Sequence, residues 1–101
     1  MKLVIITAIS EFENDIKTML KKAKVKSFTH TDVMGYNDIS EEALATNWFA
    51  NEMNKTDSIL FYAFVNKENV DLLFDLVKDF NAKQKSLSNI HVASLNIEKS
   101  N

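Results

Sequence analysis

Two short runs of consecutive apolar residues, rich in β-branched and aromatic side chains, dominate the hydropathy pattern of the chain. They are residues 3–8, Leu-Val-Ile-Ile-Thr-Ala, and residues 58–65, Ser-Ile-Leu-Phe-Tyr-Ala-Phe-Val. Each run is too short for an independent helix, and continuous apolar runs of this length are typical of strands that are buried on both faces. We therefore predict that these segments are the two central strands of a sheet.

Apolar residues at spacings of three and four follow each run and predict two amphipathic helices. The first helix, over 11–23, has Phe12, Ile16, Met19, Leu20 and Ala23 on its stripe. The second, which begins after Asn66 and ends near Ala82, has Val70, Leu73, Phe74, Val77 and Phe80. Ser10 and Glu13 have the spacing of a capping box, so we expect Ser10 to be the N-cap of the first helix.

Two further strands and one long insertion complete the pattern. Residues 26–35 alternate in polarity and predict a more exposed strand that closes at Gly35, and residues 90–97 predict a final strand. The segment between strands, 36–55, is compatible with either a helix or an irregular excursion. With right-handed crossovers, this order predicts an α+β, ferredoxin-like β-α-β-β-α-β sandwich, with a four-stranded antiparallel sheet and two helices on one face.

The 101 residues are enough for one domain, 1–101, with a modest core. Both faces of the first predicted strand are apolar, because Leu3 and Ile5 alternate with Val4 and Ile6. Two helices on one side of the sheet leave the other side open. We therefore expect association of subunits to cover the open face.

Composition narrows the possible functions. Twelve basic and 14 acidic residues give a net charge of −2, so no global positive field favours nucleic acid as a partner. The chain has no cysteine, which excludes disulfides, thiolate nucleophiles and zinc sites that use sulfur, and fits a cytoplasmic location. No stretch approaches the roughly 20 apolar residues that cross a bilayer, so direct membrane insertion is not expected.

Signatures of catalysis are missing from the sequence. It has no Gly-x-Ser-x-Gly elbow, no P-loop and no glycine fingerprint for a dinucleotide. The carboxylate pairs Glu41–Glu42 and Asp71–Asp75 fall on predicted helices, where capping, dipole compensation or solvation explains them. We expect a protein that is not an enzyme.

Two segments resemble strands of the PII-like signalling proteins, and the resemblance spans nearly the whole chain. Residues 28–36, Phe-Thr-His-Thr-Asp-Val-Met-Gly-Tyr, are similar to the family's second strand, a Thr-x-Thr-Glu-Val-x-Gly-aromatic pattern at the base of the long T-loop. Residues 90–95, Ile-His-Val-Ala-Ser-Leu, are similar to its fourth strand. The resemblance implies a homotrimer whose sheets face inward and whose T-loop-like excursion, here 36–55, binds a target protein such as a membrane transporter.

The resemblance also implies candidate site residues. Thr29, Gly35 and Tyr36 match family positions in the cleft between subunits, where a small ligand would control the excursion. Trp48 and Phe49, large aromatic residues within the excursion, are the candidates for contact with a partner protein, or alternatively for burial within the trimer.

One departure from the family concerns nucleotide binding. Members that bind adenine nucleotides have a Gly-x-Gly-Asp-Gly-Lys loop before the fourth strand, where this chain has Ala-Lys-Gln-Lys-Ser-Leu-Ser-Asn at 82–89. Without glycines, the backbone does not readily adopt the positive-φ turns that aim N–H groups at phosphates. ATP binding in the family manner is not expected, and the ligand stays unidentified.

A metal-binding protein of the CutA-like kind, linked to divalent metal tolerance or efflux, is the alternative interpretation. His30 and Asp32 share one face of a predicted strand, and His91 lies on another, so nitrogen and oxygen ligands for zinc or copper are present. Symmetry copies in a trimer would have to bring them together. The competing interpretation is that these residues are ordinary exposed or hydrogen-bonded strand residues.

Overall fold

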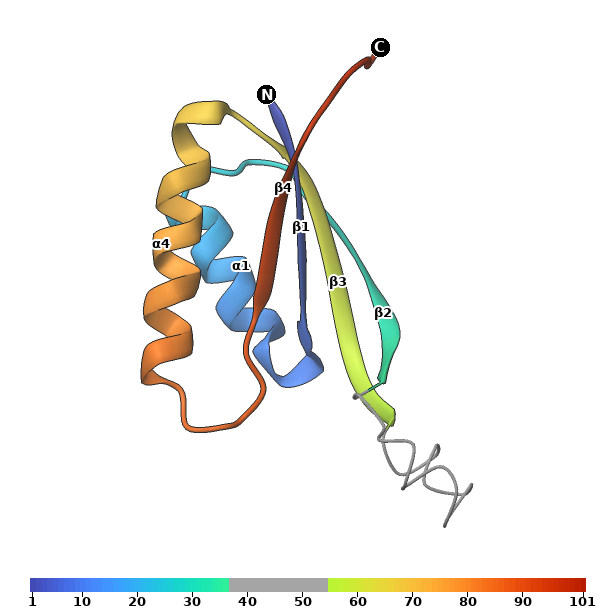
Figure 1. Cartoon of the computed structure of the whole chain (residues 1–101), viewed down its shortest axis with the longest axis vertical. Helices are drawn as coiled ribbons and strands as arrows, with labels where there is room; N and C mark the ends of the chain where they lie inside the picture. Colours follow the sequence, from blue (N-terminus) through green and yellow to red (C-terminus); the bar gives the residue numbers. More distant parts are fainter. Residues whose placement is uncertain (37–54) are drawn as a thin grey trace.

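The computed structural model describes residues 1–36 and 55–101, which form a four-stranded sheet with two helices on one face (Figure 1). In chain order the elements are β1 (Lys2–Ile9), the 3-10 turn η1 (Ser10–Phe12), α1 (Glu13–Lys22), β2 (Thr29–Tyr36), β3 (Lys55–Val65), α4 (Lys67–Lys83) and β4 (His91–Asn96). The predicted ferredoxin-like β-α-β-β-α-β fold is confirmed.

The strand order is β2-β3-β1-β4, and every neighbouring pair is antiparallel. β1 pairs with β3 from Lys2↔Val65 to Ile9↔Ser58, and with β4 on its other side. The two continuous apolar runs are therefore the central strands, as predicted, and the more polar β2 and β4 are the edges.

The core lies between the helices and one face of the two central strands. This covered face consists of Val4, Ile6 and Ala8 of β1 and of Ile59, Phe61, Ala63 and Val65 of β3, all buried. α1 contributes Ile16, Met19 and Leu20, and α4 contributes Val70, Leu73 and Val77. At the beginning of α1 and the end of α4, the rings of Phe12 and Phe80 meet edge to face with centroids 4.9 Å apart.

Neither α1 nor α4 covers the opposite side of the sheet, which we call the open face (Figure 1). Its apolar residues are Leu3, Ile5, Ile9, Val33, Leu60, Tyr62, Phe64, Ala93 and Leu95. Three of these side chains stay well exposed: Tyr62 at 41%, Phe64 at 52% and Leu95 at 44%. Alternation along the strands therefore places large apolar side chains on both faces, while the two helices cover one of them.

The beginning of α1 differs from the prediction. Ser10 opens the 3-10 turn, and no side chain caps either that turn or α1, so the predicted capping box is wrong. The backbone N–H of Glu13 donates to the Ser10 carbonyl, and the Glu13 carboxylate accepts a hydrogen bond from Lys17 Nζ at 2.9 Å. Because the chain tightens into a 3-10 turn directly after β1, backbone bonding replaces the side-chain cap.

The end of α1 has a left-handed residue that is not glycine. Lys24 has φ 64°, its N–H donates to the Lys21 carbonyl, and the N–H of Val25 donates to the Leu20 carbonyl. These two bonds form a Schellman motif, in which glycine is the usual residue at the left-handed position. In a chain with one glycine, a lysine adopts this strained conformation and the buried Val25 anchors the turn.

Several predicted boundaries shift by a few residues. β2 begins at Thr29 and not at 26, because the preceding residues close α1, and β3 begins at Lys55 and not at 58. Tyr36 pairs with Lys55 as the last rung between β2 and β3, so both ends of the predicted 36–55 excursion belong to the sheet. Residues 37–54, with Trp48 and Phe49, lie outside the described residues. In the described part of the chain, neither helix is long and apolar enough to cross a membrane.

Candidate functional site

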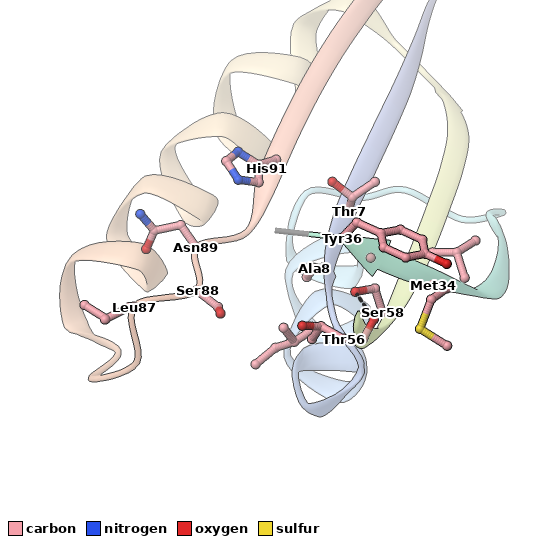
Figure 2. Close-up of a pocket in the computed structure, with 13 residues that line it drawn as sticks. Thr7, Ala8, Met34, Tyr36, Thr56, Ser58, Leu87, Ser88, Asn89 and His91 are labelled. Carbon is pink, nitrogen blue, oxygen red and sulfur yellow. Dashed lines mark hydrogen bonds between the residues drawn. The ribbon is translucent and has the colours of Figure 1, made fainter. Parts of the chain in front are cut away.

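A cavity of about 440 Å³ lies at the end of the sheet where β1 and β2 finish and β3 and β4 begin. Figure 2 shows residues of the loop before β4 on one side of it and residues of β2 and β3 on the other, with β1 behind. Its polar lining consists of Thr7, Tyr36, Thr56, Ser58, Ser88, Asn89 and His91. Its apolar lining consists of Ala8, Ile9, Val33, Met34 and Leu87, and Gly35 completes it.

Strand register explains why polar groups gather here. Thr7 is paired with His91 of β4, while Ser58 of β3 lies between its partners Ile9 and Val33. At this end the open face changes from large apolar residues to hydroxyl groups and an imidazole. The strands therefore hold a polar site next to an apolar surface on a rigid frame.

Gly35 permits a close approach between β2 and β3. A Cβ atom at this position would lie 2.5 Å from the hydroxyl of Ser58, and that hydroxyl donates to the Thr56 carbonyl at 3.1 Å. The backbone of Gly35 does not have a positive φ. A side chain at this position would therefore require the Ser58 hydroxyl to move, whereas the backbone conformation of Gly35 does not require a glycine.

The loop between α4 and β4 is held by its own side chains. The two hydrogens of the Gln84 amide nitrogen are shared among three acceptors, the carbonyls of Ser86 and Ser88, both at 2.9 Å, and the side-chain oxygen of Asn89 at 3.1 Å. The Gln84 side-chain oxygen accepts from the Ser86 N–H at 2.7 Å, and the Ser86 hydroxyl accepts from the Ser88 N–H at 3.1 Å. This network replaces the glycine-rich loop of the resemblance with a closed, polar turn.

Asn81 of α4 fixes the end of the same loop. Its amide nitrogen donates to the Ile90 carbonyl at 2.9 Å, and its side-chain oxygen accepts from the Ile90 N–H at 2.8 Å. Ile90 is itself buried in the core. The pair of bonds therefore ties the wall of the cavity to α4 just before β4 begins.

The three residues that the sequence predicts to bind a ligand lie in two different places. Gly35 and Tyr36 line the cavity. Thr29 lies at the other end of β2, paired with Tyr62, and six residues of extended strand separate it from Gly35 by about 20 Å. A single chain therefore brings two of the three predicted residues together.

The candidate metal ligands are dispersed over the sheet. His30 lies on the covered side of edge strand β2, where its ring contacts that of Phe61 at a centroid distance of 5.1 Å, and Asp32 follows on the same side. His91 lies on the open face of the opposite edge strand and lines the cavity. Among residues 1–36 and 55–101, no three histidine or acidic side chains form a cluster that could hold a metal ion.

Sequence reasoning missed the hydroxyl groups that line the cavity. Thr7 is the next-to-last residue of the first apolar run and Ser58 begins the second, so the hydropathy pattern assigns both to buried strands. A signal was available, because antiparallel pairing of adjacent central strands brings the end of one next to the beginning of the other. Thr56 and Asn89 had no comparable signal in the sequence.

Comparison with known proteins gives structural relatives only. No protein-family model matches the chain, and no curated protein sequence matches it. Among solved structures, it is similar to CPII, a nitrogen regulatory PII-like protein from Thiomonas intermedia K12, bound to ADP, AMP and bicarbonate. That match has a TM-score of 0.61 at 16% identity and covers 97% of this chain and 94% of CPII.

A second CPII structure, bound to ADP, AMP and acetate, matches with a TM-score of 0.57 at 18% identity over 95% of this chain and 88% of that one. Coverage of nearly the full length of both chains includes all four strands and both helices. At these identities the likeness concerns the fold. The chain therefore has the ferredoxin-like fold of the PII-like nitrogen regulatory proteins, as the resemblance of its β2 and β4 segments implies.

Proposed function

We propose that this chain is a non-enzymatic regulatory protein of the PII-like kind, a homotrimer whose β2–β3 excursion binds a target protein under the control of a small ligand. One observation carries the proposal: a polar cavity adjoins an uncovered apolar sheet face, in the fold of the PII-like proteins. The apolar face supports association, and the cavity supports ligand binding.

The open face supports the trimer. Tyr62, Phe64 and Leu95 remain 41–52% exposed on a surface that also includes the half-buried Leu3 and Ile5. Burial of apolar surface stabilises by about 25 cal/mol per Å², so a second copy that covers this face adds stability that one chain lacks. Sheets that face inward around a threefold axis would bury the open face of all three copies.

The position of the cavity supports control by a ligand. Gly35 and Tyr36 line it, and Tyr36 is the last residue of β2 before the excursion. A ligand that binds one arrangement of the excursion better than another shifts the population toward that arrangement. CPII is bound to ADP, AMP and bicarbonate in its structure, and an analogous small ligand here would contact Gly35, Tyr36 and, across a subunit boundary, Thr29.

The target is proposed to be a cytoplasmic surface of a membrane transporter or another regulated protein. Trp48 and Phe49 of the excursion would be the contacts, because buried aromatic residues supply much of the binding energy of protein interfaces. The proposal places the protein in the cytoplasm.

Two measurements test this function. Light scattering after size-exclusion chromatography should give three times the 11.5 kDa mass of the chain at low micromolar concentration, whereas a stable monomer would defeat the proposal. The double substitution Trp48→Ala with Phe49→Ala should then abolish capture of the target protein from a lysate and keep the trimer mass. Loss of the trimer in the double variant would assign these residues to the subunit interface.

A further inference from the structure

We propose that the cavity at the end of the sheet selects an uncharged polar ligand and discriminates against phosphorylated ones, with Gln84 as the residue that sets this selectivity. The inference rests on the proposed function, in which the cavity binds a small ligand, and it specifies the chemical class of that ligand.

The first observation is the character of the lining. None of the 13 described residues that line the cavity is lysine, arginine, aspartate or glutamate, and the titratable side chains among them are His91 and Tyr36. The lining offers hydroxyl, amide and imidazole groups together with apolar walls from Met34 and Leu87. Such a surface satisfies the hydrogen bonds of a neutral ligand but supplies no fixed cation for a phosphate.

The second observation concerns the backbone of the loop, 84–90. Phosphate is held by successive N–H groups that converge on one point. Here every second N–H is already bonded within the protein: Ser86 to Gln84, Ser88 to the Ser86 hydroxyl, and Ile90 to Asn81. The loop therefore presents no run of consecutive N–H donors to an anion.

Gln84 is a positioning residue, because it holds the loop and is not among the residues that line the cavity. The two hydrogens of its amide nitrogen are shared among the Ser86 and Ser88 carbonyls and the Asn89 side-chain oxygen, and its own side-chain oxygen accepts from the Ser86 N–H. Loss of this side chain releases the Ser86 N–H and the carbonyls of Ser86 and Ser88, so the backbone can rearrange.

The test compares adenosine, AMP and ADP, which share a base and a sugar and differ in charge. Calorimetric titrations use the full chain at a concentration at which it is assembled, so that any residue contributed by a second copy is in place. We expect adenosine to bind at least tenfold more tightly than AMP or ADP, because the phosphate would lose water without gaining a charged partner. A tenfold difference in affinity corresponds to about 1.4 kcal/mol of binding free energy. Equal or tighter binding of AMP or ADP overturns the inference.

The variant Gln84→Ala should reduce the preference for adenosine over AMP at least threefold. Lys85→Ala is the matched control, since Lys85 is the next residue of the same loop, is exposed and does not line the cavity. It should leave all three affinities unchanged. An unchanged preference in Gln84→Ala would show that Gln84 does not set the selectivity. A lower AMP affinity in Lys85→Ala would show that a loop lysine binds phosphate.

Absence of binding by all three probes up to millimolar concentration also overturns the inference. That outcome is distinct from failure of the proposed function, which depends on the trimer mass and on capture of a target. If the chain forms a trimer and captures its target but binds none of the probes, the proposed regulatory function is supported and the inferred ligand class is wrong.

Discussion

The two faces of the sheet are built from the same strands but have different surroundings. On β3, Phe61 points to the covered face and is 1% exposed, whereas Phe64 points to the open face and is 52% exposed. Both are phenylalanines of one strand, three positions apart. The comparison shows that the composition of a strand specifies how much burial its faces require, whereas the topology of the chain decides which face receives it.

The largest effect expected from this comparison is on the free energy of unfolding. Phe61→Ala should lower it by about 3–5 kcal/mol, because a large buried ring is lost and a cavity remains among Ile6, Ile59 and the helices. Phe64→Ala is the matched control. Its effect should be below about 1 kcal/mol at protein concentrations low enough to keep the chain monomeric. Urea denaturation at two protein concentrations measures both.

The same variant, Phe64→Ala, also tests whether the open face is a subunit interface. At high micromolar concentration, the cost of Phe64→Ala should increase, because unfolding of an oligomer depends on concentration. A cost that is the same at every concentration would show that the open face is not a subunit interface.

The second expected effect is on association. Tyr62→Asp puts a charge into the centre of the open face and should shift the mass measured by light scattering from trimer to monomer. Leu72→Asp is the control, because Leu72 is a large apolar residue with the same 41% exposure, but on the outer side of α4. A trimer mass in both variants would contradict a role for the open face in association. A monomer mass in both would indicate that α4 also lies in the subunit interface.

A smaller effect is expected at the glycine beside the cavity. Gly35→Ala should lower the free energy of unfolding by about 1 kcal/mol, since the new Cβ forces the Ser58 hydroxyl to rotate away and lose its bond to the Thr56 carbonyl. Ser58→Ala in the same chain removes the hydroxyl and should restore part of that loss, giving a coupling of at least about 0.5 kcal/mol. Additive costs in urea denaturation would mean that β2 and β3 adjust without strain.

These residues also show how far sequence reasoning reaches. The fold could be predicted because the central strands and both helices have strong periodic patterns, and their order leaves few topologies. Gly35 and Tyr36 could be placed because they end a recognisable strand. By contrast, Thr7 and Ser58 become neighbours only through the β1–β3 register, and Gln84 has no local pattern, because its hydrogen bonds depend on the shape of the loop.

Local details of the helices were harder still. Ser10 and Glu13 have the spacing of a capping box, but the 3-10 turn after β1 and the competing bond from Lys17 prevent it. Lys24 adopts a positive φ against its own preference, because closure of α1 and burial of Val25 outweigh the strain. In both places tertiary context overrides a local preference.

The smallest expected effect lies on the helix side, at the Glu13–Lys17 ion pair on α1, where the atoms are 2.9 Å apart and both side chains are more than a third exposed. The hydrogen bond from Lys17 is the main cause that lowers the pKa of Glu13 below its ordinary 4.5, and the charge of His30 is a minor one. Because the pKa of Glu13 is lower in the folded protein than in the unfolded chain, the ion pair stabilises the fold fully above the unfolded-state pKa. This stabilisation is lost as pH falls through the folded-state pKa. Exposure to solvent and salt keeps it small.

Glu13→Gln should therefore cost a little stability near neutral pH, and its difference from the parent chain should disappear as pH falls through the lowered pKa of Glu13, or in 1 M salt. Glu68→Gln, in the first turn of α4, is the control. No ion pair involves Glu68 in the part of the chain that the structure describes, so its variant should not show the same dependence. A carboxyl pKa for Glu13 at or above 4.5 in an NMR titration would contradict the pairing. Because this exposed pair should contribute far less than Phe61, a large acid dependence at Glu13 would mean that the covered face depends on charge as well as on apolar packing.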